Sequence, residues 1–259
     1  MSSQKLPTVV VVHGAWSPPI LYAKLAKALQ HVGFVVRTPA LPTCNGARPP
    51  NSSYSQDVTT VRSILDDLIE HDGQEVVLLM HSYGGLVGSQ AAEGLSRKVR
   101  AAKGLKGGIT AAIYMCAYMC RDKSVRDLIE ASGFEPLLPE RIPHNDDGTC
   151  TINNAEELLY GDLAEEDKAG AMVSTAIFNG EAFFGRNNYA AWSDIHSVYI
   201  RTTKDFVVPE AFQNMFIDDA KADDGIIHVE VMETGHSPHI KDPQSVTKIV
   251  LSAVDASRV

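Results

Sequence analysis

The sequence has no long hydrophobic run and no cluster of positive charge. No apolar run approaches the ~20 residues that cross a bilayer, so we expect no membrane association. Lysine and arginine are dispersed and the net charge is −9, which disfavours nucleic acid as a partner. The first residues lack the apolar stretch of a signal peptide, so we expect a cytoplasmic protein.

Cysteine is also scarce, and its spacing matches no zinc site. The four cysteines are Cys44, Cys116, Cys120 and Cys150. Cys116 and Cys120 lie in or beside an apolar run, where a small buried thiol fits. We therefore expect reduced, structural thiols and no metal site.

What the sequence does contain is enough apolar material for one substantial core. Of 259 residues, 44% are hydrophobic. Short apolar runs alternate with helix-like segments, and their continuous apolarity is typical of parallel strands covered on both faces. The predicted strands are 8–12, 34–41, 75–80, 109–117, 198–202 and 226–232. The predicted helices are 21–31, 56–71, 84–95, 209–220 and 244–254. This alternation predicts an α/β fold with a mainly parallel, doubly wound sheet.

The alternation stops between residues 120 and 192, a stretch too long for a plain connection. Charged, glycine-containing and proline-containing pieces are mixed there with apolar residues that include Phe134, Leu137, Phe183 and Phe184. We predict an inserted helical lid, or cap, over residues 120–192, with a short helix in 165–177. The core is then 1–119 and 193–259. A disordered excursion is the alternative, which the aromatic content disfavours.

Ser82 is the candidate nucleophile. It follows the apolar run 75–80 and precedes the small residues Gly84 and Gly85, a pattern that predicts a serine on a strand-to-helix turn. A hydroxyl is a poor nucleophile at neutral pH, so it needs a base to take its proton and donors for the oxyanion that it creates.

Two further strand ends carry the partners that such a serine needs. Asp205 follows the fifth predicted strand and His236 follows the sixth. Carboxyl ends of parallel strands meet at one edge of a sheet. His236 can accept the Ser82 proton because an imidazole titrates near neutrality, and Asp205 can orient that ring. The alternatives are a turn aspartate and a loop histidine. Asp122 is a rival acid, although its charged run indicates a solvated ion pair.

The loop after the first strand supplies a candidate donor. Gly14 permits close approach of the backbone, so we predict the N–H groups of Ala15 and Tyr83 as the oxyanion donors. His13 is predicted to brace this loop. For His81 and His239 we favour packing or solvent exposure over chemistry.

These motifs together resemble the α/β-hydrolase superfamily. The resemblance rests on His13-Gly14-Ala15-Trp16, on Met80-His81-Ser82-Tyr83-Gly84-Gly85 and on the order Ser82, Asp205, His236. It covers the chain outside the lid. Residues after Asp205 and His236 look like the branch of plant salicylate-binding methyl esterases and hydroxynitrile lyases. The resemblance implies a cofactor-free enzyme with a cap over an apolar pocket, which hydrolyses an ester through an acyl-serine.

The chain departs from these relatives at two places. Met80 stands where the family pattern has glycine, and a side chain there can crowd the turn. Ser237 follows His236 where the resembling lyases have lysine, and the first loop carries Gly14 and Ala15 rather than threonine. These differences disfavour cyanohydrin cleavage.

Three functions stay open at this point. The first is hydrolysis of an ester, lactone or thioester of a small to medium, apolar or aromatic substrate. The second uses the same residues to cleave or rearrange a C–C bond of a ketone or polyketide-like metabolite. The third is a non-catalytic small-molecule receptor. Each needs a small-molecule ligand, and a homodimer is neither required nor excluded. Candidate pocket residues are Trp16, Tyr118, Met119, Phe178, Phe184 and Trp192.

Overall fold

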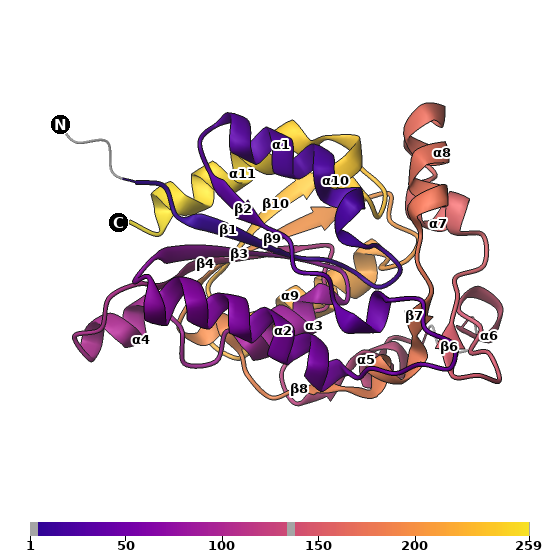
Figure 1. Ribbon diagram of the computed structural model, residues 1–259, viewed down its shortest axis with the longest axis horizontal. Helices are drawn as coiled ribbons and strands as arrows, with labels where there is room; N and C mark the ends of the chain where they lie inside the picture. Colours follow the sequence, from indigo (N-terminus) through magenta and orange to yellow (C-terminus); the bar gives the residue numbers. More distant parts are fainter. Residues whose placement is uncertain (1–4, 134–137, 259) are drawn as a thin grey trace.

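A six-stranded sheet forms the centre of the molecule (Figure 1). The computed structural model describes residues 5–133 and 138–258, so Phe134 and Leu137 of the predicted lid lie outside the described residues. The strand order is β10-β9-β4-β3-β1-β2, and every neighbouring pair is parallel. The strands are β1 (Thr8–Val12), β2 (Val35–Arg37), β3 (Glu75–His81), β4 (Gly108–Met115), β9 (His196–Thr202) and β10 (Ile227–Met232).

Helices cover both faces of this sheet (Figure 1), which confirms the predicted doubly wound fold. One face carries α1 (Ala23–His31), α10 (Pro238–Lys241) and α11 (Pro243–Ala256). The other carries α2 (Tyr54–Asp66), extended by a π-helical turn (Asp67–His71), together with α3 (Gly84–Ala91), α4 (Arg97–Ala102) and α9 (Glu210–Ala222). Side chains alternate along a strand, so Val9 and Val11 pack in one core while Val10 and Val12 pack in the other.

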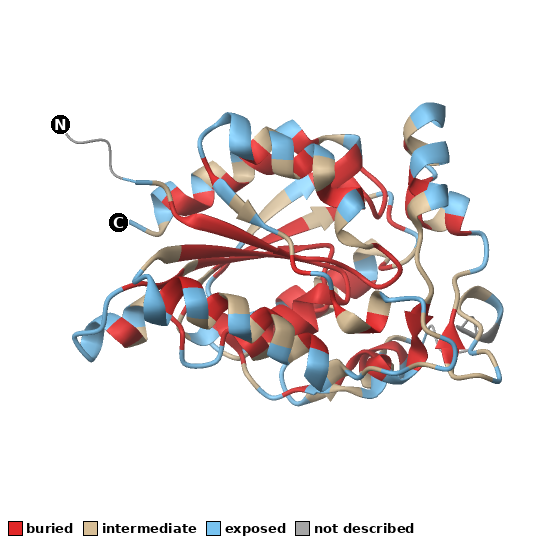
Figure 2. Ribbon diagram, in the orientation of Figure 1, coloured by how far each residue is buried: buried red, intermediate tan, exposed pale blue. Residues whose placement is uncertain are grey.

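The two edge strands differ from the prediction of continuous burial (Figure 2). Val35 on β2 and Val231 on β10 are about half exposed, because an edge strand has a neighbour on one side only. The predicted strand 34–41 is also too long. Strand β2 ends at Arg37, two residues before Pro39, which has no N–H to donate to a strand ladder.

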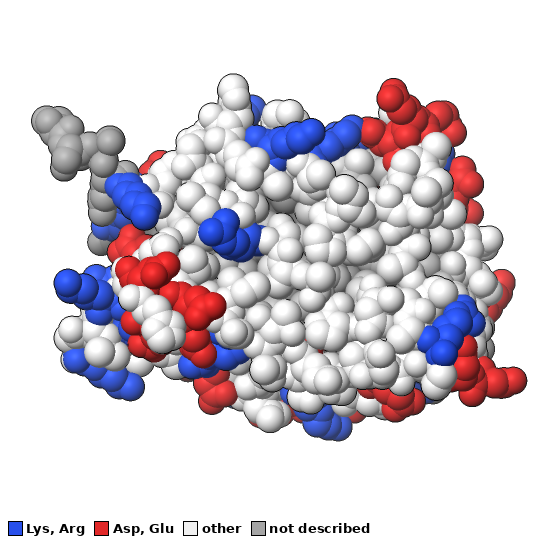
Figure 3. All heavy atoms as spheres, in the orientation of Figure 1, with Lys and Arg blue, Asp and Glu red and all other residues white. Residues whose placement is uncertain are grey.

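Residues 120–192 leave the sheet after β4 and return before β9. They hold the helices α5 (Val125–Ser132), α6 (Leu138–Arg141), α7 (Ala155–Tyr160) and α8 (Glu165–Ser174), the 3₁₀ turns Gly180–Phe184 and Ala191–Ser193, and two short antiparallel ladders. Strand β5 (Lys123–Ser124) pairs with β8 (Arg186–Asn187), and β6 (Thr149–Cys150) pairs with β7 (Phe178–Asn179). The helix predicted within 165–177 is α8. Acidic side chains gather over it in Figure 3.

Two short 3₁₀ turns, Pro19–Tyr22 and Pro42–Cys44, complete the regular structure near the first strands. All four cysteines are free thiols, as expected. Among the described residues, no helix combines the length and apolarity that a bilayer crossing requires.

Candidate active site

Ser82 lies on the sharp turn between β3 and α3, as the sequence predicted. Its φ of 52° is in the left-handed region, which a serine enters only under local constraint. The turn is held against the end of β1, because a Cβ on Gly84 would stand 2.3 Å from the Val12 carbonyl oxygen. Only glycine permits this approach. The sequence after Ser82 is thus matched to the strained geometry at Ser82.

Met80, which replaces the glycine of the family pattern, is accommodated by another glycine. A Cβ on Gly88 of α3 would lie 2.6 Å from the Met80 sulfur, so the absence of that Cβ makes room for the thioether. Met80 is fully buried and stays in register with Val12 of β1. The expected crowding is therefore relieved from the helix side, and Ser82 keeps its positive φ.

Asp205 and His236 are in direct contact at the same edge of the sheet. The Nδ1 atom of His236 lies 2.7 Å from Oδ2 of Asp205, and both side chains are buried. The other carboxylate oxygen accepts hydrogen bonds from the N–H groups of Val207 and Val208, both at 2.8 Å. These bonds hold the carboxylate in an orientation that favours a proton on Nδ1 of His236 and leaves Nε2 to accept one.

The Ser82 hydroxyl is not hydrogen-bonded to His236 among the described residues. Asp205 and His236 of the predicted relay are therefore hydrogen-bonded to each other, whereas Ser82 lies on the turn between β3 and α3 without a bond to them in the described structure. Catalytic hydrogen bonds are often long in proteins without substrate and shorten in the reacting complex. The arrangement is compatible with the predicted relay.

His236 has to reach back across the sheet to approach Ser82. Its strand β10 is three positions from β3 in the strand order, a span of roughly 14 Å at ordinary strand spacing. Two contacts at the His236 carbonyl oxygen hold the loop there. Nε2 of His81 lies 2.8 Å from this oxygen, and the Cys116 thiol lies 3.7 Å from it.

His81 connects this loop with the one after β1. A carbonyl can only accept a hydrogen bond, so Nε2 of His81 carries the proton that reaches His236. Burial holds the pKa of His81 well below its usual value, so the ring is neutral and its Nδ1 accepts. The Tyr22 hydroxyl donates to Nδ1 at 2.6 Å and accepts from the Gly14 N–H at 3.0 Å. One chain of hydrogen bonds therefore runs from Gly14 to His236.

The predicted oxyanion donors take no part in this hydrogen-bond network. Neither the Ala15 N–H nor the Tyr83 N–H has a hydrogen-bond acceptor within the described part of the protein. The Tyr83 ring points elsewhere, since its hydroxyl donates to Asp57 at 2.8 Å. Both residues are buried beside the Ser82 turn, where a low dielectric strengthens any bond that they make.

His13 and His239 are structural. The His13 ring lies 2.9 Å from the Gly14 carbonyl oxygen and accepts from the Leu41 N–H at 3.0 Å, so it braces the loop as predicted. Burial lowers its pKa to about 4. His239 stacks on Tyr22 with ring centroids 4.2 Å apart, and neither of its ring nitrogens has a partner among the described residues. Burial lowers the pKa of His239 to about 3, so it packs as a neutral ring.

His81, Cys116 and His236 bring three potential metal ligands within 4.8 Å of one another. The two histidine rings, however, already make hydrogen bonds within the protein. Both nitrogens of His81 are hydrogen-bonded, and Nδ1 of His236 is bonded to Asp205. Burial also raises the pKa of the Cys116 thiol, which disfavours the thiolate that a metal needs. The cluster fits a hydrogen-bonded support better than a metal centre.

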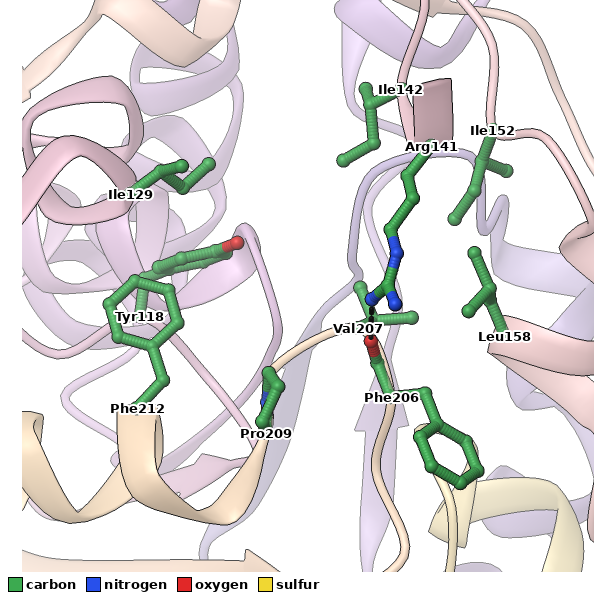
Figure 4. Close-up of a pocket in the computed structure, with 10 residues that line it drawn as sticks. All are labelled: Tyr118, Ile129, Arg141, Ile142, Ile152, Leu158, Phe206, Val207, Pro209 and Phe212. Atoms are coloured by element: carbon green, nitrogen blue, oxygen red, sulfur yellow. Dashed lines mark hydrogen bonds between the residues drawn. The ribbon is translucent and has the colours of Figure 1, made fainter. Parts of the chain in front are cut away.

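A hollow that is partly open to solvent lies beside the Asp205 loop (Figure 4). Its walls are apolar apart from Tyr118 and Arg141. The lining residues are Tyr118, Ile129, Arg141, Ile142, Ile152, Leu158, Phe206, Val207, Pro209 and Phe212. The Tyr118 N–H donates to the Ser82 carbonyl oxygen at 3.1 Å, and Phe206 and Val207 directly follow Asp205. The hollow therefore adjoins both the turn of Ser82 and the loop of Asp205.

Of the predicted pocket residues, Tyr118 alone lines this hollow. Trp16 and Phe178 pack against each other beside Phe183, and Met119 is buried in the core. Asp122 forms an exposed ion pair with Arg121, as expected for the rival acid.

Two of the predicted pocket residues lie away from this hollow. Phe184 is 52% exposed and does not belong to the lining. Trp192 precedes β9 by four residues, and a Cβ on Gly225, just before β10, would touch its ring. Trp192 therefore lies at the amino edge of the sheet, whereas Ser82, Asp205 and His236 follow the carboxyl ends of their strands.

The sheet order, the serine turn and the Asp205–His236 pair together define a class of protein, and comparison with known proteins agrees with it. A model of the alpha/beta hydrolase family matches residues 9–249, and the chain belongs to this family. The hydrolase nvfD of Aspergillus novofumigatus is 26% identical over 251 residues, which is 95% of this chain and 96% of that protein.

Solved structures share the fold at lower identity. A pyrethroid hydrolase from Sphingobium faniae superposes with a TM-score of 0.74 at 19% identity, over 96% of this chain and 98% of that one. Tomato methylketone synthase I, solved with 2-tridecanone, gives a TM-score of 0.71 at 16% identity, over 97% and 98% of the two chains. At these identities the likeness shows the fold alone.

Proposed function

We propose that the protein is a serine hydrolase of carboxylic esters, with Ser82 as nucleophile, His236 as general base and acid, and Asp205 as the residue that orients His236. The observation that carries the proposal is the buried Asp205–His236 pair, 2.7 Å apart, at the sheet edge where Ser82 stands on a strained turn. The hydrolase named among its relatives supports the same reaction class.

The reaction has two halves. The Ser82 oxygen attacks the ester carbonyl while Nε2 of His236 takes the hydroxyl proton, and His236 returns this proton to the departing alcohol. Water then attacks the acyl-serine with His236 again as base. Asp205 keeps the proton on Nδ1 and stabilises the imidazolium that forms in each half.

The N–H groups of Ala15 and Tyr83 stabilise the oxyanion. Both are buried and have no other acceptor among the described residues, so they cost no rearrangement when charge develops on the carbonyl oxygen. By comparison with single-donor deletions in other hydrolases, each contributes about 3 kcal/mol in the transition state.

Hydrolysis of short-chain p-nitrophenyl esters tests the proposal. We expect Ser82→Ala to lower kcat by about 10⁴-fold to 10⁶-fold, since other serine hydrolases lose that much with the nucleophile. Ser89→Ala is the matched control, because Ser89 is a buried serine on the next helix whose hydroxyl bonds Tyr114. It should stay within a few fold of wild type. Equal turnover by wild type and folded Ser82→Ala would exclude the proposal.

Cleavage of a C–C bond beside a ketone is the second candidate. The Asp205–His236 pair supports it, because a histidine held by an acid can transfer a proton without the serine, and tomato methylketone synthase I shares the fold. In decarboxylation of a β-keto acid, CO₂ leaves as the C–C bond breaks, the oxyanion donors hold the resulting enolate, and protonated His236 gives its proton to the enolate carbon, so the serine is dispensable. Activity on a β-keto substrate that survives in Ser82→Ala indicates this route. A trapped acyl-Ser82 adduct, seen as a mass increase on the serine peptide, indicates hydrolysis.

A further inference from the structure

Among the described residues that line the apolar hollow, Arg141 is the one cationic side chain (Figure 4). It ends α6, and its Nη1 atom donates to the Phe206 carbonyl oxygen at 3.2 Å. A guanidinium has five N–H donors, so most of them stay available beside this bond. The surrounding side chains of Ile142, Ile152 and Leu158 offer no acceptor.

Its lack of an acidic partner distinguishes Arg141 from nearly every other arginine. In the described part of the chain, all other arginines except Arg37 form an ion pair with a carboxylate. Arg37 is exposed on the edge strand β2, where water solvates it. Arg141 instead faces an apolar hollow, in which an unpaired charge attracts an anion more strongly than it would in open water.

The hollow is also placed to receive one end of a substrate. The Val207 N–H donates to Asp205, and the Tyr118 N–H donates to the Ser82 carbonyl, so two wall residues hold parts of the candidate catalytic site. Tyr118 and Phe212 form an aromatic pair with centroids 5.9 Å apart on the wall across from Arg141 (Figure 4). A molecule that reacts at Ser82 and extends into the hollow would contact both this apolar wall and the guanidinium.

We propose that the ester substrate carries a carboxylate at the end remote from the scissile bond, and that Arg141 binds this carboxylate. The inference rests on the proposed ester hydrolysis and adds a substrate class to it: an apolar chain or ring with an ester at one end and an acid at the other. The planar guanidinium can bind both carboxylate oxygens, which selects a carboxylate over a neutral polar group.

Matched p-nitrophenyl esters test the substrate class. In each pair the acyl chain ends either in a carboxylate or in a methyl group, and several chain lengths are compared because the reach to Arg141 decides the fit. Wild type should prefer the carboxylate at one length by about tenfold to hundredfold in kcat/KM, the range expected for a charge-assisted pair at a partly desolvated site. Higher salt should reduce this preference.

Arg141→Gln should abolish the preference and leave the rate on the methyl-ended ester within a few fold of wild type. Arg141→Lys should keep part of it, because the charge remains while the planar fork is lost. Arg37→Gln is the matched control, since Arg37 also lacks a carboxylate partner but lies on the exposed edge strand. It should leave the preference unchanged. A purely structural Arg141 would change both esters of a pair equally.

Binding to Ser82→Ala separates this inference from the proposed function. The monomethyl and dimethyl esters of one dicarboxylic acid differ only in the free carboxylate, and calorimetry on Ser82→Ala measures both without turnover. Tighter binding of the monomethyl ester that disappears in Ser82→Ala with Arg141→Gln supports the carboxylate site, even if the protein hydrolyses neither ester. Equal binding of the two esters, or a preference that survives Arg141→Gln, overturns it while ester hydrolysis stands or falls on its own assay.

Discussion

The support beneath Ser82 and the hollow beside it differ in how their polar groups are bonded. Beneath the serine, His81 is fully buried and both of its ring nitrogens are hydrogen-bonded. In the hollow, Arg141 is only partly buried and, among the described residues, makes one hydrogen bond, to a carbonyl. A buried network in which every polar group is hydrogen-bonded is rigid, whereas a guanidinium with unpaired N–H donors can bind a ligand. In the proposed function, the rigid region carries the chemistry and the hollow selects the substrate.

The largest expected effect comes from Asp205, and it tests whether the rigid region carries the chemistry. Asp205→Asn removes the charge that orients His236, and by comparison with other serine hydrolases we expect kcat to fall by about 10³-fold to 10⁴-fold. Stopped-flow or steady-state ester assays measure the loss. Asp242→Asn is the control, because Asp242 only caps α11 by accepting from the Ser245 N–H. A loss of less than tenfold in Asp205→Asn would mean that the rigid region is not the catalytic one.

A smaller effect is expected at His81, which positions His236 without touching substrate. His81→Ala removes the bonds to Tyr22 and to the His236 carbonyl, so kcat should fall by about tenfold to hundredfold, with KM changed less. His81→Gln can still donate toward the carbonyl and should recover part of the loss. His228→Ala, an exposed change on β10, controls for the loss of a histidine. Equal changes in kcat and KM, with no recovery by glutamine, would indicate a packing role alone.

The smallest effect concerns His239, and it acts on stability rather than rate. Its folded pKa of about 3 lies below the ordinary value of 6.5, so the unfolded chain binds a proton first as the pH falls. The stability from burying the neutral ring is complete above pH 6.5 and is lost progressively toward pH 3. Between pH 7 and pH 5 this amounts to about 2 kcal/mol.

His239→Phe should remove this dependence while it keeps an aromatic ring against Tyr22. Urea unfolding at pH 7 and pH 5 measures the free energy of unfolding of both proteins. The wild type should lose about 2 kcal/mol more than His239→Phe over this interval, and ester turnover at pH 7 should stay within a few fold. Parallel losses in the two proteins would show that His239 is protonated in the folded state.

The parts of the fold that the sequence predicts well depend on short segments. The four inner strands coincide with apolar runs that are buried between the helices on both faces, and Ser82 lies on its turn because Gly84 allows contact with Val12. The predicted strand runs past the end of β2 because apolar residues continue after Arg37, whereas Pro39 has no N–H to continue the strand ladder. Asp205 and His236 were predictable because the carboxyl ends of parallel strands meet at one edge.

The parts that the sequence did not predict depend on distant contacts. His81 bonds Tyr22, 59 positions earlier, and His236, 155 positions later, and no local pattern marks either contact. Arg141 carries no distinguishing signal in the sequence, because an arginine in a charged, irregular segment usually faces water or an acid. The sequence does not show which edge of the sheet Trp192 occupies, because an aromatic residue near the start of a strand looks the same whether it lies at the amino or the carboxyl edge.

The Met80 and Gly88 pair has a consequence for how such serines are recognised. The usual signature asks for a small residue two positions before the nucleophile, and a search that insists on it would pass over this chain. Here the missing side chain is on helix α3 instead of strand β3, because Gly88 leaves space for the Met80 sulfur. The requirement is thus one of free volume beneath the turn, and a chain can meet it from either of the two elements that flank the serine.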